Sequence, residues 1–273
     1  MGAIIMLRIV IVSWNVKDLV TRCIESIVAM SSDVDYDIVV VDNASKDGTQ
    51  QILQDVVKKY AYIQAILNPT NRGFAAACNQ GINVQGTMRN ERSPNYYLLL
   101  NPDTEMSSDV LKRMVAWMNN HPKAGIAGCM LKNPNGTIQP SIRRFPTLFS
   151  QLLIAIKVHH LTKNLVVLHH YFWSDFDYSQ EREVDQVMGA FFMVRRSCWD
   201  ELQGLDERFF IWFEEVDFCL RAMHAGWQVW YVPISGVVHH AHASFKKQSF
   251  FIKQRNFFSS MIKYFLKHRL RIS

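Results

Sequence analysis

The sequence Leu98-Leu99-Leu100-Asn101-Pro102-Asp103-Thr104 ends an apolar run that begins at Tyr96. Because proline donates no backbone hydrogen bond and disfavours helix in the residue before it, we predict a buried strand that ends at Asn101. Ligands of open parallel sheets bind just beyond the carboxyl ends of strands, so Asp103 is expected at the rim of a site. There it could hold a divalent cation, and the cation a phosphate. A simpler interpretation is that Asp103 and Thr104 cap a helix near residues 107–117.

Strand-like and helix-like segments alternate on both sides of this stretch, a pattern typical of βαβ units. The β-branched and apolar runs predict strands over residues 7–13, 36–41, 61–67, 96–100, 125–130, 187–194, 227–232 and 236–240. The helical patterns fall over residues 18–30, 50–60, 74–82, 197–202 and from 209–215 to about 226. We therefore predict an α/β fold with a Rossmann-like, mostly parallel sheet and helices on both faces.

Composition is that of an ordinary globular protein: 273 residues, 49% hydrophobic, with 12 glycines and 8 prolines. No apolar run approaches the ~20 residues needed to cross a bilayer. The first residues lack the basic region and cleavage site of a signal peptide, so a cytoplasmic location is expected. The five cysteines are scattered without a C-x-x-C pair, which predicts neither a disulfide framework nor a thiolate metal site.

Positive charge is concentrated in the last part of the chain. The net charge is +6, yet residues 245–273 contain eight Lys or Arg and no Asp or Glu. This distribution argues against nucleic-acid binding by the main body and favours a tail that meets an anionic surface. The tail predicts a basic amphipathic helix, with one face formed by Phe258, Met261, Ile262 and Phe265 and another by Lys263, Lys267 and Arg271.

Two roles are open for this predicted helix. It could lie on an anionic membrane, peripheral to its inner face, or it could pack its apolar side on the domain with the lysines in solvent. If it lies on the membrane, removing residues from Phe250 onward should reduce binding to anionic liposomes. Aromatic residues of the tail could instead build a homodimer.

Polar residues follow two other predicted strands. Asp42 follows the strand over 36–41, where it could form a turn with its own backbone or accept the N3–H of a uracil or thymine ring. In Asn71-Arg72-Gly73, a cation and a flexible backbone could lie near phosphates, or the segment could be a plain loop.

An acidic pair follows an aromatic run later in the chain. Glu214 and Glu215 come directly after Phe209-Phe210-Ile211-Trp212-Phe213. Apolar surroundings raise the pKa of a carboxyl group, which suits a general base, although acids at a helix start also complement the helix dipole. His239, at the end of a late strand, could ligate a metal or be structural.

These motifs together resemble family 2 inverting glycosyltransferases, and most of all bacterial rhamnosyltransferases of cell-surface polysaccharide synthesis. The resemblance covers roughly residues 7–244, in order. It rests on Val12-Ser13-Trp14-Asn15, Val41-Asp42-Asn43-Ala44-Ser45-Lys46-Asp47-Gly48-Thr49, Asn71-Arg72-Gly73-Phe74-Ala75, Leu99-Leu100-Asn101-Pro102-Asp103-Thr104, Gly189-Ala190-Phe191-Phe192-Met193-Val194-Arg195-Arg196, Gly204-Leu205-Asp206-Glu207-Arg208-Phe209-Phe210, Phe213-Glu214-Glu215-Val216-Asp217-Phe218-Cys219-Leu220-Arg221 and Val238-His239.

The resemblance implies a GT-A fold over residues 1–244, with a nucleotide-binding half over about 1–130, an acceptor half over about 131–244, and a separate tail over 245–273. It implies a nucleotide-sugar donor, dTDP-rhamnose or a UDP-sugar, and Mg²⁺ or Mn²⁺ as cofactor. The acceptor would be a saccharide or a polyprenyl-linked saccharide.

The resemblance also assigns roles to single residues. Asp103 and His239 would bind the metal, and Glu215, or Glu214 in its place, would be the catalytic base. Asn101 stands where the family has the first acid of its D-x-D motif. The donor would be bound by Ser13, Asn15, Asp42, Asn43, Arg72, Gly73 and Asn101. Such an enzyme requires Asp103 and Glu215 to converge on one bound glycosyl group.

Other functions stay open from the residues. A dinucleotide-dependent dehydrogenase should carry G-x-G-x-x-G after the first strand, where this chain has Ser13-Trp14-Asn15-Val16-Lys17. A nucleotidyltransferase usually carries a Gly- and Lys/Arg-rich loop there. A sugar-nucleotide-binding or scaffold protein without activity would keep the same binding residues.

Overall fold

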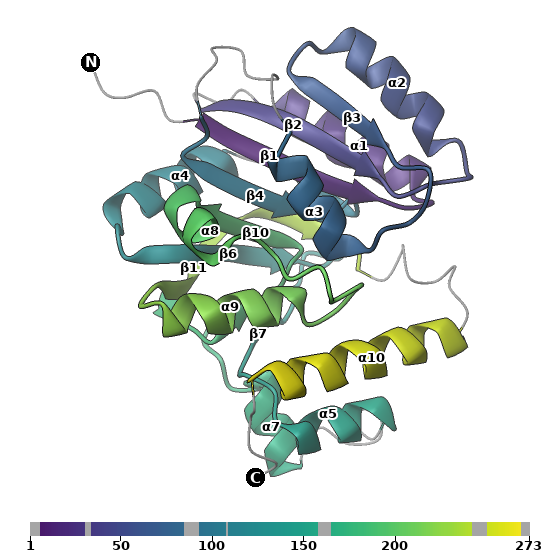
Figure 1. Ribbon diagram of the computed structural model, residues 1–273. Coiled ribbons are helices and arrows are strands. Elements are labelled where there is room, and N and C mark those ends of the chain that lie inside the picture. The colour runs from purple at the N-terminus through teal and green to yellow at the C-terminus, as the bar shows by residue number, and fades with distance from the viewer. Residues whose placement is uncertain are drawn as a thin grey trace.

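A large twisted sheet with helices on both faces forms the centre of the molecule (Figure 1). The computed structural model describes residues 6–30, 34–84, 93–107, 109–157, 165–241 and 250–268. Within these residues the sheet order is β3-β2-β1-β4-β10-β6-β11-β5, with β8 paired to β11. The strands are β1 (Met6–Ser13), β2 (Asp35–Asp42), β3 (Ile63–Leu67), β4 (Tyr96–Leu100), β5 (Thr104–Met106), β6 (Ala124–Lys132), β8 (Arg182–Glu183), β10 (Phe191–Arg195) and β11 (Gln228–His239).

The sheet is mostly parallel, as predicted. Strands β1, β2, β3 and β4 run in one direction, and β6 runs parallel to β11. Strand β10 lies between β4 and β6 and is antiparallel to both, so its first residues meet the carboxyl end of β4. The segment Gly189-Ala190 before β10 therefore reaches the same edge as Asn101.

Helices cover both faces because the strands of the sheet are apolar on both sides. Residues Leu7, Ile9 and Ile11 pack with α1, α2 and α4 on one face, whereas Val10 and Val12 pack with α3, α8 and α9 on the other. These helices are α1 (Lys17–Ala29), α2 (Thr49–Lys59), α3 (Phe74–Ile82), α4 (Val110–Asn120), α8 (Arg196–Leu202) and α9 (Glu214–His224). The alternation along one strand thus places two hydrophobic cores, one on each side of the sheet.

A buried charged pair joins β1 and β2. Arg8 of β1 and Asp37 of β2 are both buried, and Arg8 Nη2 lies 2.8 Å from Asp37 Oδ2. Arg8 Nη1 also donates to the carbonyl oxygens of Ile82 and Val84. The Arg8 guanidinium therefore donates to the Asp37 carboxylate and to two carbonyl oxygens. Such additional hydrogen bonds offset the cost of removing a buried ion pair from water.

Three local predictions were wrong. The strand predicted over 187–194 is divided into β9 (Gln186–Val187), which belongs to a second, small sheet, and β10. Thr104 does not cap a helix; it begins β5, and α4 starts later, after its N-cap Asp109. The two strands predicted over 227–232 and 236–240 form one strand, β11, whose pairing with β6 shifts in register between Val232 and Val237. Strand β5 pairs with the end of β11, so that Thr104 lies opposite His239. This pairing brings the segment after β4 beside the late histidine.

A small second sheet and three helices lie below the main sheet in Figure 1. The small sheet pairs β7 (Ile142–Arg143) with β9 (Gln186–Val187). The helices are α5 (Leu148–Ala155), α7 (Val166–Phe172) and α10 (Phe250–His268). No helix in the described ranges combines the length and the apolar character that crossing a bilayer requires.

The tail helix α10 packs against the main body through a different face from the one predicted. Ser260, Met261 and Tyr264 are buried, whereas Phe258 and Ile262, which were expected on the same apolar face as Met261, are exposed. The position of Arg271 lies outside the described residues. Helix α10 therefore both packs on the protein and keeps apolar side chains in solvent.

Candidate active site

Ser13 and Asp42 end two neighbouring parallel strands and lie opposite each other in the register. Both are fully buried. The Ser13 hydroxyl donates to Asp42 Oδ1 at 3.0 Å, while Ser45 N and Gln50 Nε2 donate to Oδ2 at 2.8 and 2.9 Å. Three donors thus hold the Asp42 carboxylate in one orientation, and this orientation sets the direction of its remaining lone pairs.

The loops beyond β1 and β2 are tied to each other. Asn15 N donates to Ser45 Oγ at 2.8 Å, and Lys46 N donates to Asn15 Oδ1 at 2.7 Å. Asn15 has a φ of 54°, in the left-handed region where asparagine is among the better-tolerated residues. The side chain of Asn15 therefore fixes the loop after β2, and with it the surroundings of Asp42.

Asn43 connects this loop to the segment that contains Arg72 and Gly73. Asn43 Nδ2 donates to Gly73 O at 3.0 Å, and its Oδ1 accepts from Asn68 Nδ2 at 3.1 Å. The Arg72 backbone N–H lies 3.5 Å from the same Asn43 Oδ1, whereas the Arg72 side chain is exposed. An exposed guanidinium at a rigid backbone position can reach a bound anion.

Gly73 joins this rim to the segment that precedes α9. Its φ is +88°, and a Cβ at this position would lie 2.6 Å from Phe210 O. The next residue, Phe74, donates its backbone N–H to the same carbonyl oxygen at 2.7 Å. Only glycine allows this approach, so the sequence Arg72-Gly73 is placed against the aromatic run that leads to Glu214.

Asp103 and His239 are brought together by the pairing of β5 with β11. Both side chains are buried, and His239 Nε2 lies 3.2 Å from Asp103 Oδ1. His239 Nδ1 lies 2.7 Å from Gln139 Oε1, and Gln139 Nε2 donates to Asn133 Oδ1 at 2.9 Å. The second bond identifies the Gln139 oxygen as an acceptor, so Nδ1 carries the proton and donates it to that oxygen.

This arrangement leaves the Nε2 lone pair of a neutral His239 facing a carboxylate oxygen. Two lone pairs at 3.2 Å repel each other unless a positive charge lies between or beside them, either the proton of an imidazolium or a bound cation. In the described part of the chain no cluster of three or more His, Cys, Asp or Glu forms a complete metal site. Asp103 and His239 nevertheless fit a divalent cation that takes its other ligands from substrate phosphates and water.

A short chain of contacts connects the Asp103 segment with Glu215. The backbone N–H of Asn101 donates to Ala190 O at 3.2 Å. A Cβ on the neighbouring Gly189 would lie 2.9 Å from Glu215 Oε1, and the Gly189 backbone N–H supports the Glu215 carboxylate. Asp103 and Glu215 are therefore placed around one edge of the sheet and not in unrelated parts of the molecule.

Glu214 and Glu215 are neighbouring acids in the first turn of α9. Burial and the neighbouring Glu215 raise the pKa of Glu214 well above its ordinary value. Burial also raises the pKa of Glu215, but hydrogen bonds, one of them from Glu214, and the charge of Arg143 lower it in part. Among the described residues, no hydrogen-bond partner reaches Glu214 Oε2 or Glu215 Oε2, and both atoms are buried. Burial therefore opposes a negative charge on both members of the pair at once.

The backbone before this pair is in an uncommon conformation. Trp212 and Phe213 have φ values of 64° and 68°. Bulky residues seldom adopt positive φ, at a cost of about 1–3 kcal/mol each, and such strain concentrates at functional sites. Packing of Phe213 against Tyr264 of α10, with ring centroids 5.3 Å apart, helps to hold this conformation.

Asp217, the third acid of this turn, has a different environment. Its carboxylate contacts Arg221 Nε at 2.8 Å, Lys267 Nζ at 2.6 Å and His268 Nε2 at 2.7 Å. Although burial raises its pKa, the bonds from His268, Lys267 and Arg221 outweigh that effect and hold the pKa below its usual range. Asp217 therefore anchors α10 and is not available as a base.

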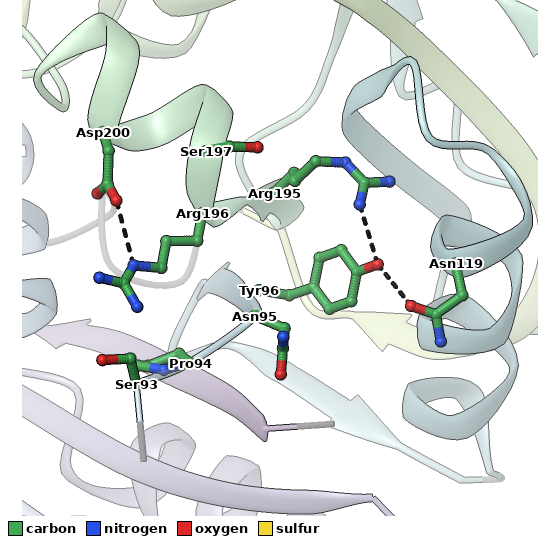
Figure 2. A pocket seen from close by; sticks show the side chains of 9 residues that line it. All are labelled: Ser93, Pro94, Asn95, Tyr96, Asn119, Arg195, Arg196, Ser197 and Asp200. Carbon is green, nitrogen blue, oxygen red and sulfur yellow. Dashed lines mark hydrogen bonds and ion pairs between the residues drawn. The ribbon is translucent and has the colours of Figure 1, made fainter. Parts of the chain in front are cut away.

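A pocket of about 460 Å³ lies at the opposite edge of the sheet, and Figure 2 shows its lining. Tyr96 begins β4, and Arg195 ends the antiparallel β10, so both lie at the amino end of β4. Arg195 Nη1 donates to the Tyr96 hydroxyl, which donates to Asn119 Oδ1. These side chains satisfy one another, and none of the predicted site residues belongs to this pocket.

Three contributors to the candidate site were not predicted from the sequence. Gln139 orients His239, Gln50 holds Asp42, and Gly189 lies against Glu215. Gly189 belonged to a motif of the resemblance but had no role assigned. Nothing in the local sequence distinguishes Gln139 or Gln50 from a surface glutamine, because their partners are distant in the chain or lie around a turn.

Comparison with known proteins places this chain among enzymes that transfer sugars. Residues 8–201 match the family model of glycosyl transferase family 2, which covers more than half of the chain. The protein belongs to glycosyl transferase family 2, and it is a glycosyltransferase.

Two relatives are similar over most of their length. One is the N-acetylglucosaminyl-diphospho-decaprenol L-rhamnosyltransferase of Mycobacterium tuberculosis, 27% identical over 249 residues, or 87% of this chain and 77% of the relative. The other is the rhamnosyltransferase WbbL of Escherichia coli, 27% identical over 270 residues, or 97% of this chain and 92% of the relative.

Solved structures confirm the fold class. GalNAc-T7 with UDP, GalNAc and Mn²⁺ has a TM-score of 0.64 at 18% identity, covering 86% of this chain and 43% of that one. The mannosyltransferase PcManGT of Pyrobaculum calidifontis with GDP-Man and Mn²⁺ has a TM-score of 0.59 at 14% identity, covering 94% and 64%. The α/β architecture is that of a GT-A glycosyltransferase.

Proposed function

We propose that this protein is a metal-dependent inverting glycosyltransferase that moves rhamnose from dTDP-rhamnose to a saccharide or lipid-linked saccharide. The observation that supports the proposal is the contact chain from Asp103 through Asn101, Ala190 and Gly189 to Glu215. Along this chain a cation bound by Asp103 and His239 and a base at Glu215 would lie around one edge of the sheet. The catalytic domain would span 1–244, with a nucleotide half to about 130 and an acceptor half to 244, followed by the tail over 245–273.

The donor half of the proposal uses the rigid rim beyond β1 and β2. Asp42 would accept the N3–H of a thymine or uracil ring, because Ser13 and its other donors fix its remaining lone pairs. Arg72 would meet the diphosphate with its exposed guanidinium. Both relatives are named as rhamnosyltransferases, which supports dTDP-rhamnose, whereas a solved structure of similar fold contains UDP and supports a UDP-sugar as the alternative.

A divalent cation, Mg²⁺ or Mn²⁺, would be held by Asp103 and His239 together with the diphosphate. When bound, it offsets the negative charge that builds on the departing nucleoside diphosphate. Gln139 keeps the proton on His239 Nδ1, so that Nε2 stays available. Asn101 takes the place of the first acid in the family motif, and its backbone is tied to Ala190. The protein would thus supply two ligands and depend on the substrate for others.

Glu215 would be the general base. It would take the proton from an acceptor hydroxyl while that oxygen attacks the anomeric carbon from the face opposite the diphosphate, which inverts the configuration. Glu214, held neutral by burial, would donate its hydrogen bond to Glu215 and keep the base ionised. Glu214 would therefore position and tune the base without touching the substrate.

The acceptor is proposed from the relatives. The mycobacterial relative is named for a sugar linked to decaprenol through a diphosphate, which supports a polyprenyl-linked saccharide as acceptor. Glu215 could take the proton from any saccharide hydroxyl that reaches it, whether or not the saccharide carries a lipid. An assay therefore has to vary the lipid and the sugar of the acceptor separately.

The test is turnover by the purified protein with a panel of nucleotide sugars, a synthetic polyprenyl-diphosphate sugar as acceptor, and Mg²⁺, Mn²⁺ or EDTA. We expect transfer from dTDP-rhamnose, loss of transfer in EDTA, and a product whose anomeric configuration, read by NMR, is the opposite of the donor's. Asp103→Ala should abolish metal-dependent donor binding, and Glu215→Gln should abolish transfer while donor binding persists.

The alternatives predict different results. Donor binding without turnover of any acceptor would identify a sugar-nucleotide-binding or scaffold protein. Release of pyrophosphate from a nucleoside triphosphate and a sugar phosphate would identify a nucleotidyltransferase. Either result, or retention of configuration, would overturn the proposal.

A further inference from the structure

Helix α5 turns an apolar face to solvent. Phe149, Leu152 and Ile156, spaced at i, i+3 and i+7, lie on one side of the helix and are 42–68% exposed. On the other side, Ser150, Gln151 and Ala155 are buried. The amphipathic pattern is thus reversed relative to an ordinary surface helix, whose apolar side faces the core.

Helix α10 also turns apolar side chains to solvent, although its buried side, with Met261 and Tyr264, is apolar as well. Its exposed stripe consists of Phe251, Phe258, Ile262 and Leu266, and Phe251 and Leu266 are 81% and 74% exposed. At 100° per residue these positions lie opposite the buried Tyr264. Because the buried side already satisfies the packing of α10 on the domain, the exposed stripe has no role in holding the helix in place.

The two helices lie side by side at one end of the molecule (Figure 1). Gln254 Nε2 of α10 approaches Ala155 O of α5 at 3.5 Å, and Lys157 Nζ lies 4.5 Å from the centre of the Phe250 ring. Leu165 and Val166, at the start of the neighbouring α7, are also exposed, Val166 being 83% exposed. We call the exposed apolar residues of α5, α7 and α10 the apolar platform.

The platform is bordered by positive charge. Lys157, Arg255 and Lys263 are exposed on α10 or directly after α5. The segments 148–157, 165–172 and 250–268 contain no Asp or Glu at all. Apolar side chains rimmed by cations and free of carboxylates complement an anionic lipid surface, which attracts each Lys or Arg near it.

We propose that the platform of α5, α7 and α10 docks this protein on the surface of an anionic membrane. The proposal commits to lipid over a second copy of the chain, because pairing two such platforms would place cations against cations without a compensating carboxylate. Phe251 and Leu266 would enter the boundary between headgroups and acyl chains, while Lys157 and Arg255 contact lipid phosphates. The proposal rests on this surface alone and stands or falls independently of the transfer reaction proposed above.

The docking surface is connected rigidly to the candidate active site. Lys267 and His268 bind Asp217 in the first turn of α9, two residues beyond Glu215. Ser260 Oγ donates to Ile211 O at 2.8 Å, and Lys263 Nζ donates to Arg208 O at 2.7 Å. Docking through the exposed side of α10 would therefore hold Glu215 at a fixed height and orientation above the lipid surface.

The experiment is co-sedimentation of the full chain with vesicles of phosphatidylglycerol and phosphatidylcholine in equal parts, or of phosphatidylcholine alone. We expect the wild type to bind the anionic vesicles more tightly, and high salt to weaken that binding. The double variant Phe251→Ser/Leu266→Ser should lower the partition coefficient by at least about tenfold. Lys157→Gln/Arg255→Gln should lower it only on anionic vesicles.

Matched controls are available on other surfaces of the chain. Met223, 46% exposed on α9, serves as the apolar control through Met223→Ser, and the exposed Lys58 and Lys59 of α2 serve as charge controls. Circular dichroism and the thermal midpoint verify that each variant is folded. Equal partitioning of the platform variants and their controls would overturn the proposal. So would a wild-type dimer, measured by light scattering, that the Phe251→Ser/Leu266→Ser variant dissociates while vesicle binding stays unchanged.

Discussion

The first turn of α9 carries acids in two contrasting environments. On the side toward Gly189, Glu214 is buried and Glu215 half-buried, no described cationic side chain makes an ion pair with either, and their pKa values are raised. On the side toward α10, Asp217 is fully buried but contacts Arg221, Lys267 and His268, and its pKa is lowered. Three neighbouring carboxyl groups in one turn thus acquire opposite protonation behaviour.

The difference shows that burial alone does not determine what a carboxyl group does. Burial disfavours the charged form in all three residues, and the outcome depends on whether cations on another element reach the group. Lys267 and His268 reach Asp217 because α10 packs across the start of α9. A carboxylate with its cations in place stabilises the fold, whereas a carboxylate without them retains the capacity to exchange a proton.

The largest expected effect is on catalysis by Glu215. Glu215→Gln removes the proposed base without changing the shape of the side chain, and we expect kcat to fall by about 10³-fold with donor affinity unchanged. In the wild type, kcat should fall as pH is lowered through the raised pKa of Glu215, and the variant should lose this dependence. Steady-state kinetics across pH measure both. If Glu214→Gln, the matched control, produced the larger loss, Glu214 would be the base.

The second prediction removes the anchored acid. Asp217→Ala leaves Arg221, Lys267 and His268 facing one another, and we expect a loss of about 3 kcal/mol in the free energy of unfolding. The Asp217 pKa is lowered in the folded state, so its contribution is fully present above the unfolded value of about 3.9 and is lost as pH falls through the folded value.

Urea unfolding at several pH values provides the measurement. The difference between wild type and Asp217→Ala should be constant near neutral pH and should shrink in acid. A difference that grows on acidification would contradict the lowered pKa of Asp217.

The third prediction concerns the connection between α10 and α9. Lys267→Met removes one cation that contacts both Asp206 and Asp217, while Arg221 and His268 remain on Asp217. Bonds to charged groups contribute about 1.5–3 kcal/mol, so we expect a loss of about 2 kcal/mol in stability, with kcat nearly unchanged. Chemical unfolding and turnover of the same preparation test this, and a loss of turnover larger than the loss of stability would show that α10 positions Glu215.

The smallest expected effect is a gain in stability. Glu214→Gln removes a group that resists ionisation, and we expect the protein to gain about 1 kcal/mol at neutral pH. Because the folded pKa of Glu214 is raised, its unfavourable contribution appears as pH rises above the unfolded value of about 4.3. The gain should therefore disappear in acid, the reverse of the behaviour expected for Asp217. A destabilised Glu214→Gln protein at neutral pH would mean that Glu214 is not held neutral.

Much of the fold follows from periodicity in the first half of the chain. The strand predicted over 96–100 and the helix predicted over 74–82 have the bounds of β4 and α3. Prediction succeeded there because parallel strands buried on both faces are continuous apolar runs. Strand β5 was missed, since three residues paired only with a distant strand carry no periodic signal of their own.

The candidate site was predictable to the extent that it lies at strand ends. Asp42 was expected where β2 ends, and Asp103 beyond β4, because the change from apolar run to polar turn is visible in the chain. The sequence could not separate Glu215 from Glu214 or Asp217, which share one turn. Gly189 lies against Glu215, and Lys267 forms an ion pair with Asp217; both residues are far from this turn in the sequence.

By itself the sequence determined the alternation of strands and helices, the position of polar residues at the carboxyl edge, and the concentration of positive charge in the tail. These properties depend on local spacing and composition. Only the tertiary structure decided that His239 would meet Asp103, that Asp217 would hold α10, and that the apolar stripe of α10 would face solvent beside α5. Each of these contacts joins residues that are far apart in the sequence. The packing of helices and strands against one another brings them together, and the order of residues within a single element does not reveal it.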